Sequence, residues 1–127
     1  MINEKPWGTE EVWASTHHSV GKILTINPNQ RLSRKYHRIK NHNIRVWEGS
    51  IVIEEGPFCP GGEVHETVLT AGMTYLMPAN VIHRLCAGPQ GATLLELSGA
   101  GPSDSVRLED DYRRVTEVPS RFPQSDK

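Results

Sequence analysis

The stretch Ile-Arg-Val-Trp-Glu-Gly-Ser-Ile-Val-Ile-Glu, residues Ile44–Glu54, decides the class of fold. Strand-forming residues stand on both sides of Glu48-Gly49, where the glycine permits a tight turn. Similar short stretches rich in Val, Ile, Leu and Thr, broken by Gly, Pro and Asn, continue in both directions along the sequence. This pattern is typical of an all-β sandwich or barrel.

The pattern predicts a series of short strands and no long helix. The expected strands are Glu10–Ser15, Val20–Asn27, Arg31–Arg38, Ile44–Trp47, Ser50–Glu54, Val64–Thr70, Met73–Met77, Ile82–Ala87 and Ala92–Ser98. One helical turn is expected near Glu109–Arg113. The length of 127 residues suits a single domain, because one hydrophobic core usually serves roughly 100–150 residues.

The charge balance gives no general attraction for nucleic acid or for an anionic membrane. There are 14 Lys plus Arg against 15 Asp plus Glu, a formal net charge of −1. The basic run 31–40 is split by strand alternation, which turns Arg34 outward and places Lys35, His37 and Ile39 on the inner face. No apolar run is long enough to span a bilayer, and we expect a cytoplasmic protein with neither a nucleic-acid nor a membrane partner. Cys59 and Cys86 form no short-spaced pair and are expected to be free thiols.

Three of the six histidines stand where a metal site would need them. His37 ends a predicted strand, and a hairpin would return His42 beside it. His83 begins a later strand that could face the same interior. Three converging imidazoles suit Zn²⁺, Mn²⁺, Fe²⁺ or Ni²⁺, although a histidine in a strand is more often an ordinary core or surface residue. The other three fit exposed positions: His17, His18 and His65.

Two segments match, with substitutions, the two sequence motifs of the cupin superfamily. The first comprises Pro28-Asn29, His37, His42 and, after six intervening residues, Gly49, with Ile39 at the position of the motif's second histidine. The second comprises Gly72, Pro78, Asn80 and His83. Asn29 and Asn80 stand where Gly is usual, and asparagine tolerates the left-handed backbone that such turns require.

A closer resemblance covers about residues 4 to 114. The chain resembles the cupin domain of type II mannose-6-phosphate isomerases and their small stand-alone relatives. The segments that carry the resemblance are Glu4–Gly8, Val20–Leu24, Arg31–Ser33, Tyr36-His37, Ile82–Arg84, Leu95–Ser98 and Asp104–Tyr112. The resemblance implies a double-stranded β-helix, a jelly-roll-like barrel. One cupin domain would span residues 1–127, with the barrel core at about 20–99 and the N-terminal strand and C-terminal segment packed on it. It also implies a homodimer, in which Trp7, Trp13 and Trp47 are available for burial.

The resemblance also implies a ligand set for a divalent metal ion. In the family the ligands are typically Gln, His, Glu and His, and the matching positions here are Lys35, His37, His42 and His83. His42 can still coordinate, whereas the Lys35 ammonium offers only donors and repels a cation. Lys35 could swing away to a carboxylate, act as a base or ligand with a lowered pKa, or replace the metal with its own charge.

The implied activity is isomerisation of a sugar or sugar phosphate, with the metal polarising an oxygen and a base moving a proton. The candidate bases are, in falling order, Glu96, Lys35 and His42. Arg107 is the candidate contact for a phosphate or sugar hydroxyl, against the alternative of a surface ion pair with Asp104, Glu109 or Asp110. Lys22 is likewise either a substrate contact or a member of a surface ion pair. Two other functions stay open: a three-histidine metal-dependent dioxygenase and a non-catalytic sugar-binding module.

Overall fold

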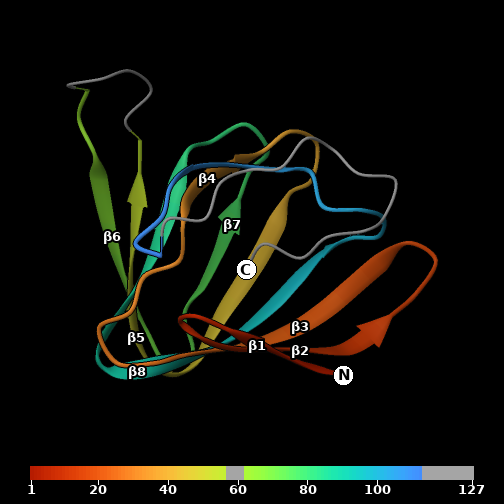
Figure 1. The fold of residues 1–127 in the computed structure, drawn as a ribbon, viewed down its shortest axis with the longest axis horizontal. Coiled ribbons are helices and arrows are strands. Elements are labelled where there is room, and N and C mark those ends of the chain that lie inside the picture. The colour runs from red at the N-terminus through yellow and green to blue at the C-terminus, as the bar shows by residue number, and fades with distance from the viewer. Residues whose placement is uncertain (57–61, 113–127) are drawn as a thin grey trace.

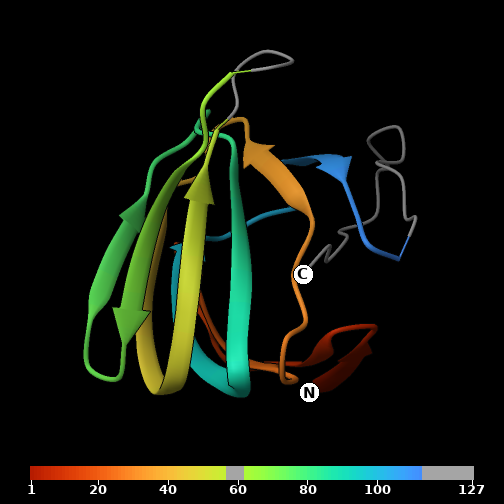
Figure 2. The same cartoon turned by 90° about the vertical axis from the view of Figure 1, so that its left-hand side faces the viewer.

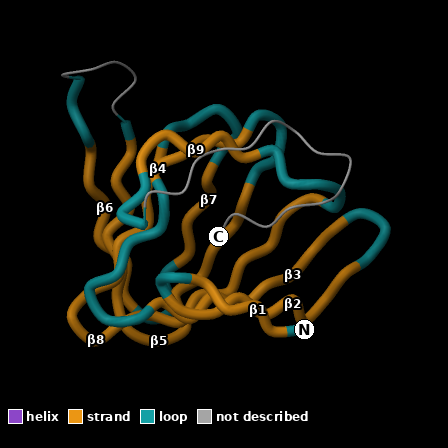
Figure 3. Tube along the Cα trace, in the orientation of Figure 1, coloured by secondary structure: helices purple, strands orange, loops and turns teal. Residues whose placement is uncertain are grey.

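The computed structural model describes residues 1–56 and 62–112, and their strands form one strongly curled, antiparallel sheet (Figure 1). The strands are β1 (Ile2–Lys5), β2 (Gly8–Ser15), β3 (Ser19–Ile26), β4 (Arg34–His37), β5 (His42–Glu55), β6 (His65–Thr70), β7 (Thr74–Met77), β8 (His83–Gly99) and β9 (Ser105–Glu109). Figure 3 shows only strands and loops in the described part of the chain. The predicted all-β class is confirmed.

Two long, bent strands replace four predicted short ones. The prediction of a hairpin turn at Glu48-Gly49 is wrong, because β5 continues without a break through these residues. β8 likewise joins two of the expected strands. Gly49 and Gly91 have positive φ values of 78° and 77°, and a Cβ on Gly49 would lie 2.1 Å from the Gly91 carbonyl oxygen. The two glycines therefore let β5 and β8 bend together, with shifts of register at Val46/Glu48 and Gly49/Ile51.

The bend lets β5 and β8 pair along both of their halves and wrap around the interior. Ile44 lies opposite Glu96, and Ile53 lies opposite Leu85. β6 and β7 pair with β5 on its other edge, and Figure 2 shows these strands side by side. β3 pairs with β8 and continues the sheet through β2 to β1.

The segment after β8 returns to the sheet as a strand. β9 pairs with β4, and β4 in turn meets β8 at Lys35↔His83. The predicted helical turn is therefore wrong at Glu109, which ends β9, while its end at Arg113 lies outside the described residues. Pairing with β4 overrides the weak local signal of this polar segment.

The hydrophobic core fills the part of the interior between the bent strands. Its fully buried side chains include Leu24, Leu32, Val46, Ile53 and Leu94. Trp7 is also fully buried there, so the prediction that Trp7 is available for burial in a dimer interface is wrong. Trp13 and Trp47 are 60% and 57% exposed, and the homodimer stays a prediction.

Several smaller predictions can be compared with the structure. Asn29 and Asn80 have φ values of 60° and 66°, which confirms their left-handed turns. Cys86 is a free thiol whose pKa is raised to about 11 by burial and by the nearby Glu54 carboxylate; Cys59 lies outside the described residues. Within residues 1–56 and 62–112, no helix is long and apolar enough to cross a membrane.

Candidate metal centre

The structure brings together three histidines from two distant parts of the sequence. His37 ends β4, His42 begins β5 and His83 begins β8, and all three are buried. The rings of His37 and His42 are stacked, with centroids 3.8 Å apart and planes 24° apart. The centroids of His37 and His83 are 5.3 Å apart. The imidazoles therefore form one cluster inside the curled sheet.

Loop contacts hold the segment from His37 to His42 against the loop that precedes His83. The backbone N–H of Asn80 donates to the carbonyl oxygen of His37 at 2.6 Å. The N–H of Ala79 donates to the Asn41 side-chain oxygen at 2.9 Å. Because Asn80 adopts a left-handed conformation, the loop turns back at this point and delivers His83 to the start of β8.

Each ring has its Nδ1 atom near an oxygen. His83 Nδ1 lies 3.0 Å from the Val81 carbonyl oxygen, and His42 Nδ1 lies 3.4 Å from Glu96 Oε1. His37 Nδ1 is 2.9 Å from Ser105 Oγ. Metal-binding histidines commonly use one ring nitrogen in this way while the other coordinates. The arrangement therefore favours Nε2 as the coordinating atom of each ring.

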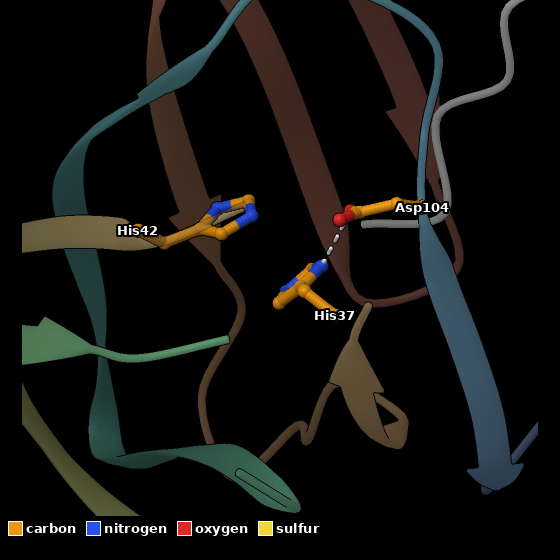
Figure 4. A group of neighbouring side chains, drawn as sticks. All are labelled: His37, His42 and Asp104. Atoms are coloured by element: carbon orange, nitrogen blue, oxygen red, sulfur yellow. Dashed lines mark ion pairs between the residues drawn. The ribbon is translucent and has the colours of Figure 1, made fainter. Parts of the chain in front are cut away.

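Asp104 is a further candidate ligand that sequence reasoning considered only as an ion-pair partner of Arg107. Ligand atoms of His37, His42 and Asp104 lie within 4.8 Å of one another (Figure 4). Asp104 Oδ1 is 3.4 Å from His37 Nδ1. Its Oδ2 accepts hydrogen bonds from the N–H groups of Ile39 and Lys40, both at 2.7 Å. Asp104 can thus bind a cation itself or orient His37 toward one.

The closeness of Asp104 depends on a pairing that no spacing rule predicts. Asp104 immediately precedes β9, and His37↔Ser105 are cross-strand partners in the β4–β9 pair. The one available signal was its place at the start of Asp104–Tyr112, a segment that carried the family resemblance.

Lys35 faces the interior, as predicted, and its side chain is buried. It lies opposite His83 on β8 and opposite Arg107 on β9, so the three side chains project from the same face of the sheet. The structure therefore places two cationic side chains in one row with a candidate metal ligand. A cation at the histidine cluster would be repelled by both.

Two other predictions about this segment are wrong. Ile39, expected to share the inner face with Lys35, is 82% exposed, because β4 ends at His37 and the chain leaves strand geometry. Arg34, expected to point outward, is buried, since the register shifts between Arg34 and Lys35. Its guanidinium binds Glu54 at 2.7 Å and Glu109 at 3.0 Å.

Glu96 is buried beside the cluster and connects it to further charges. It lies opposite Lys22 in the β3–β8 pair, on the same face of the sheet. Lys22 Nζ is 2.9 Å from the fully buried Glu10 carboxylate. The two carboxylates and the ammonium extend the polar interior from His42 across β8 and β3 to β2.

Solved structures with similar folds cover most of this chain. A cupin from Shewanella frigidimarina, described as RmlC-like, aligns with 80% of the chain and 84% of its own length at a TM-score of 0.64 and 18% identity. A double-stranded β-helix protein from Klebsiella pneumoniae covers the same shares at a TM-score of 0.65 and 20% identity. The chain has a cupin fold. No protein-family model and no curated protein sequence matches it.

The capsular polysaccharide assembling protein CapF from Staphylococcus aureus also contains this cupin fold. It aligns with 86% of the chain at a TM-score of 0.77 and 16% identity. The chain spans about a third of the length of CapF, since the alignment covers 32% of that protein. The predicted fold, a double-stranded β-helix, is therefore confirmed.

Two adjoining spaces lie at the histidine end of the cupin. The inner cavity has a volume of about 60 Å³ and is lined by Lys22, His37, His42 and Asp104, among others. The outer pocket has a volume of about 730 Å³. A small molecule that enters the outer pocket could therefore present one of its ends to the histidine cluster.

Proposed function

We propose that this cupin binds a divalent metal ion and acts on a sugar or sugar phosphate, in the manner of mannose-6-phosphate isomerases. The observation that carries the proposal is that ligand atoms of His37, His42 and Asp104 lie within 4.8 Å of one another beside a cavity that adjoins a larger pocket. The ring of His83 lies next to that of His37, with centroids 5.3 Å apart. The fold shared with a capsular polysaccharide assembling protein supports a substrate related to sugars.

The donor set fits a divalent transition metal. Neutral imidazole suits Zn²⁺, Mn²⁺, Fe²⁺ and Ni²⁺, and a carboxylate such as Asp104 can complete the set. The Nδ1 contacts of the three rings supply the outer support that metal-binding histidines generally have. A bound divalent cation would polarise a carbonyl or hydroxyl oxygen of the substrate.

The residues around the cluster would handle protons and charge. Glu96, the first candidate base, faces His42 at 3.4 Å, so it also holds that ring in place. Lys35 could move a proton if the neighbouring Arg107 and burial lower its pKa, because both disfavour the ammonium form. Arg107 suits a substrate oxyanion, since a guanidinium can donate two parallel hydrogen bonds.

The test combines metal analysis with an isomerase assay. Purified protein supplied with each of the four metals is expected to retain one divalent ion per chain and to interconvert an aldose phosphate and a ketose phosphate. His42→Ala should lower the rate by more than about 100-fold, since loss of even an outer-shell partner costs about 10- to 100-fold. His65→Ala, at an exposed position on β6, is the matched control and should change neither quantity. Metal-loaded protein without any turnover would contradict the proposal.

A second candidate function is metal-independent sugar binding without turnover. The buried cation of Lys35, in one row with His83, favours it. Calorimetry on metal-free protein would show sugar binding in that case. A set of three histidines is also compatible with a metal-dependent dioxygenase. Consumption of dioxygen by the Fe²⁺-loaded protein would support that function.

A further inference from the structure

A larger pocket lies directly outside the histidine cluster, and the chemistry above gives no role to His17, His18 or Lys40, which line it. Its volume of about 730 Å³ falls in the range of about 300–1,000 Å³ that is usual for small-molecule sites. It shares Lys40, Gly99, Ser103 and Asp104 with the inner cavity. The two spaces therefore adjoin, and one molecule can occupy both.

The inner cavity is too small for a whole sugar. Its volume is about 60 Å³, which has room for a few water molecules, since each occupies about 30 Å³ of liquid. Only the reacting end of a substrate can thus lie beside His37 and His42. The remainder of the molecule must lie in the outer pocket.

Most of the polar side chains that line the outer pocket can donate a hydrogen bond. His17 and His18 lie edge to face on its wall, with ring centroids 4.8 Å apart. Lys40 also lines the pocket, and its ammonium donates to the Gly101 carbonyl oxygen at 2.9 Å. Among the described residues that line the pocket, Asp104 is the one carboxylate, and it is turned toward His37 and the backbone N–H groups of the loop after β4. An anionic group thus finds an ammonium and two imidazoles in this pocket.

The hairpin that carries the two histidines is held in place. Thr16 Oγ1 accepts hydrogen bonds from the N–H groups of His18 at 3.2 Å and Ser19 at 2.9 Å. The N–H of Ala100 donates to the His18 carbonyl oxygen at 3.1 Å, which ties the hairpin to the end of β8. A site on such supported backbone loses little conformational entropy when a ligand binds.

We infer that the outer pocket binds the anionic group, a phosphate or a carboxylate, of a sugar whose reacting end lies at the histidine cluster. His17, His18 and Lys40 contact that anion. Sequence reasoning placed His17 and His18 on an exposed rim, and the structure adds the pocket beneath them. The inference rests on the proposed function, because it takes the bound molecule to be a sugar.

The test compares three probes by calorimetry on the full chain: mannose, mannose 6-phosphate and glucuronate. At least one anionic probe is expected to bind about tenfold more tightly than mannose, since a hydrogen bond to a charged group contributes about 1.5–3 kcal/mol. The double variant His17→Ala/His18→Ala should lose that preference and keep its thermal midpoint. His65→Ala, which removes an exposed imidazole away from the pocket, should keep the preference.

The outcomes separate this inference from the proposed function. Equal binding of all three probes, or a preference that survives the double variant, would overturn the inference even in an active isomerase. A preference that requires His17 and His18 supports it even if the protein carries no metal and turns nothing over. Metal content, measured on the same samples, should be the same in the double variant and the native chain.

Discussion

The two ends of the barrel interior are built from the same strands but have opposite chemistry. In three strands, two successive inward-facing residues differ, one being apolar and the next polar: Leu24 and Lys22 in β3, Ile44 and His42 in β5, and Leu94 and Glu96 in β8. Lys22 and Ile44 both lie opposite Glu96. In β3 and β8 the change therefore occurs at the same level, and in β5 it occurs one inward-facing position further on, where His42 lies opposite Ser98. These changes separate an apolar end from a histidine end.

The apolar end stabilises the fold, and the histidine end is the candidate for function. Apolar burial contributes about 25 cal/mol per Å², and the apolar end contains most of the fully buried aliphatic side chains. Burying Lys35, Glu10 and Glu96 instead costs desolvation free energy, which ion pairs only partly offset. Groups that cost stability and gather beside a cavity are candidates for function.

Replacing Leu94 by Ala should produce the largest loss of stability. Leu94 is fully buried and lies between Leu24 on β3 and Val46 on β5. A buried Leu→Ala substitution costs about 2–5 kcal/mol in the free energy of unfolding, and urea denaturation measures it. If the comparison of the two ends is right, the folded fraction should bind metal like the native chain. A loss below about 1 kcal/mol would show that the apolar end does not support the fold.

Replacing Lys35 by Gln should have a smaller effect, on metal affinity. Removing a buried cation in the row of His83 should strengthen divalent metal binding by about tenfold, or about 1.4 kcal/mol, because like charges repel. Competition with a chelator measures the affinity. Arg45→Gln removes the same charge from an exposed position on β5 and should leave the affinity unchanged. Unchanged metal affinity with lost activity would instead make Lys35 a participant in the reaction.

The sequence predicted the histidine end better than the pairing that completes it. The motif spacing predicted that His37, His42 and His83 come together, and the structure places their rings side by side, while their role as metal ligands stays a prediction. Asn29 and Asn80 were recognised as turn residues because few residues other than glycine tolerate positive φ. The roles proposed for Lys35, Glu96 and Arg107 stay predictions. What the sequence could not show was long-range pairing: β9 returns to β4, and this return brings Asp104 to His37.

The bends in β5 and β8 were missed for a similar reason. A glycine with positive φ is compatible with a hairpin turn and with a bulge in a continuous strand, and the choice between them depends on the partner strand. Here Gly49 lies directly against the Gly91 carbonyl. Two bends that coincide in space cannot be recognised from either segment alone.

The smallest effect should come from an exposed charge pair beside the apolar end. Arg31 Nε and Asp111 Oδ2 are 2.8 Å apart, and Arg84, next to the core residue Leu85, donates to the same carboxylate at 3.2 Å. The Arg31 hydrogen bond lowers the pKa of Asp111 below the 3.8 of an ordinary aspartate. Its stabilising contribution is therefore complete above that pKa and is lost as the pH falls through the lower value of the folded state.

Asp111→Asn tests this contribution by urea denaturation across the acid range. Because Asp111 is partly exposed and solvent screens the pair, the native chain should be more stable than the variant by less than about 1 kcal/mol at neutral pH. The difference should begin to shrink as the pH falls below about 4 and should approach zero below the lower pKa of Asp111 in the folded chain, since the carboxylate is then protonated in the folded state as well. A difference of several kcal/mol would show that this pair stabilises the fold as strongly as apolar packing does, and would contradict the comparison of the two ends. A small one confirms that the apolar end depends on packing, and that the costly charges lie with the histidines.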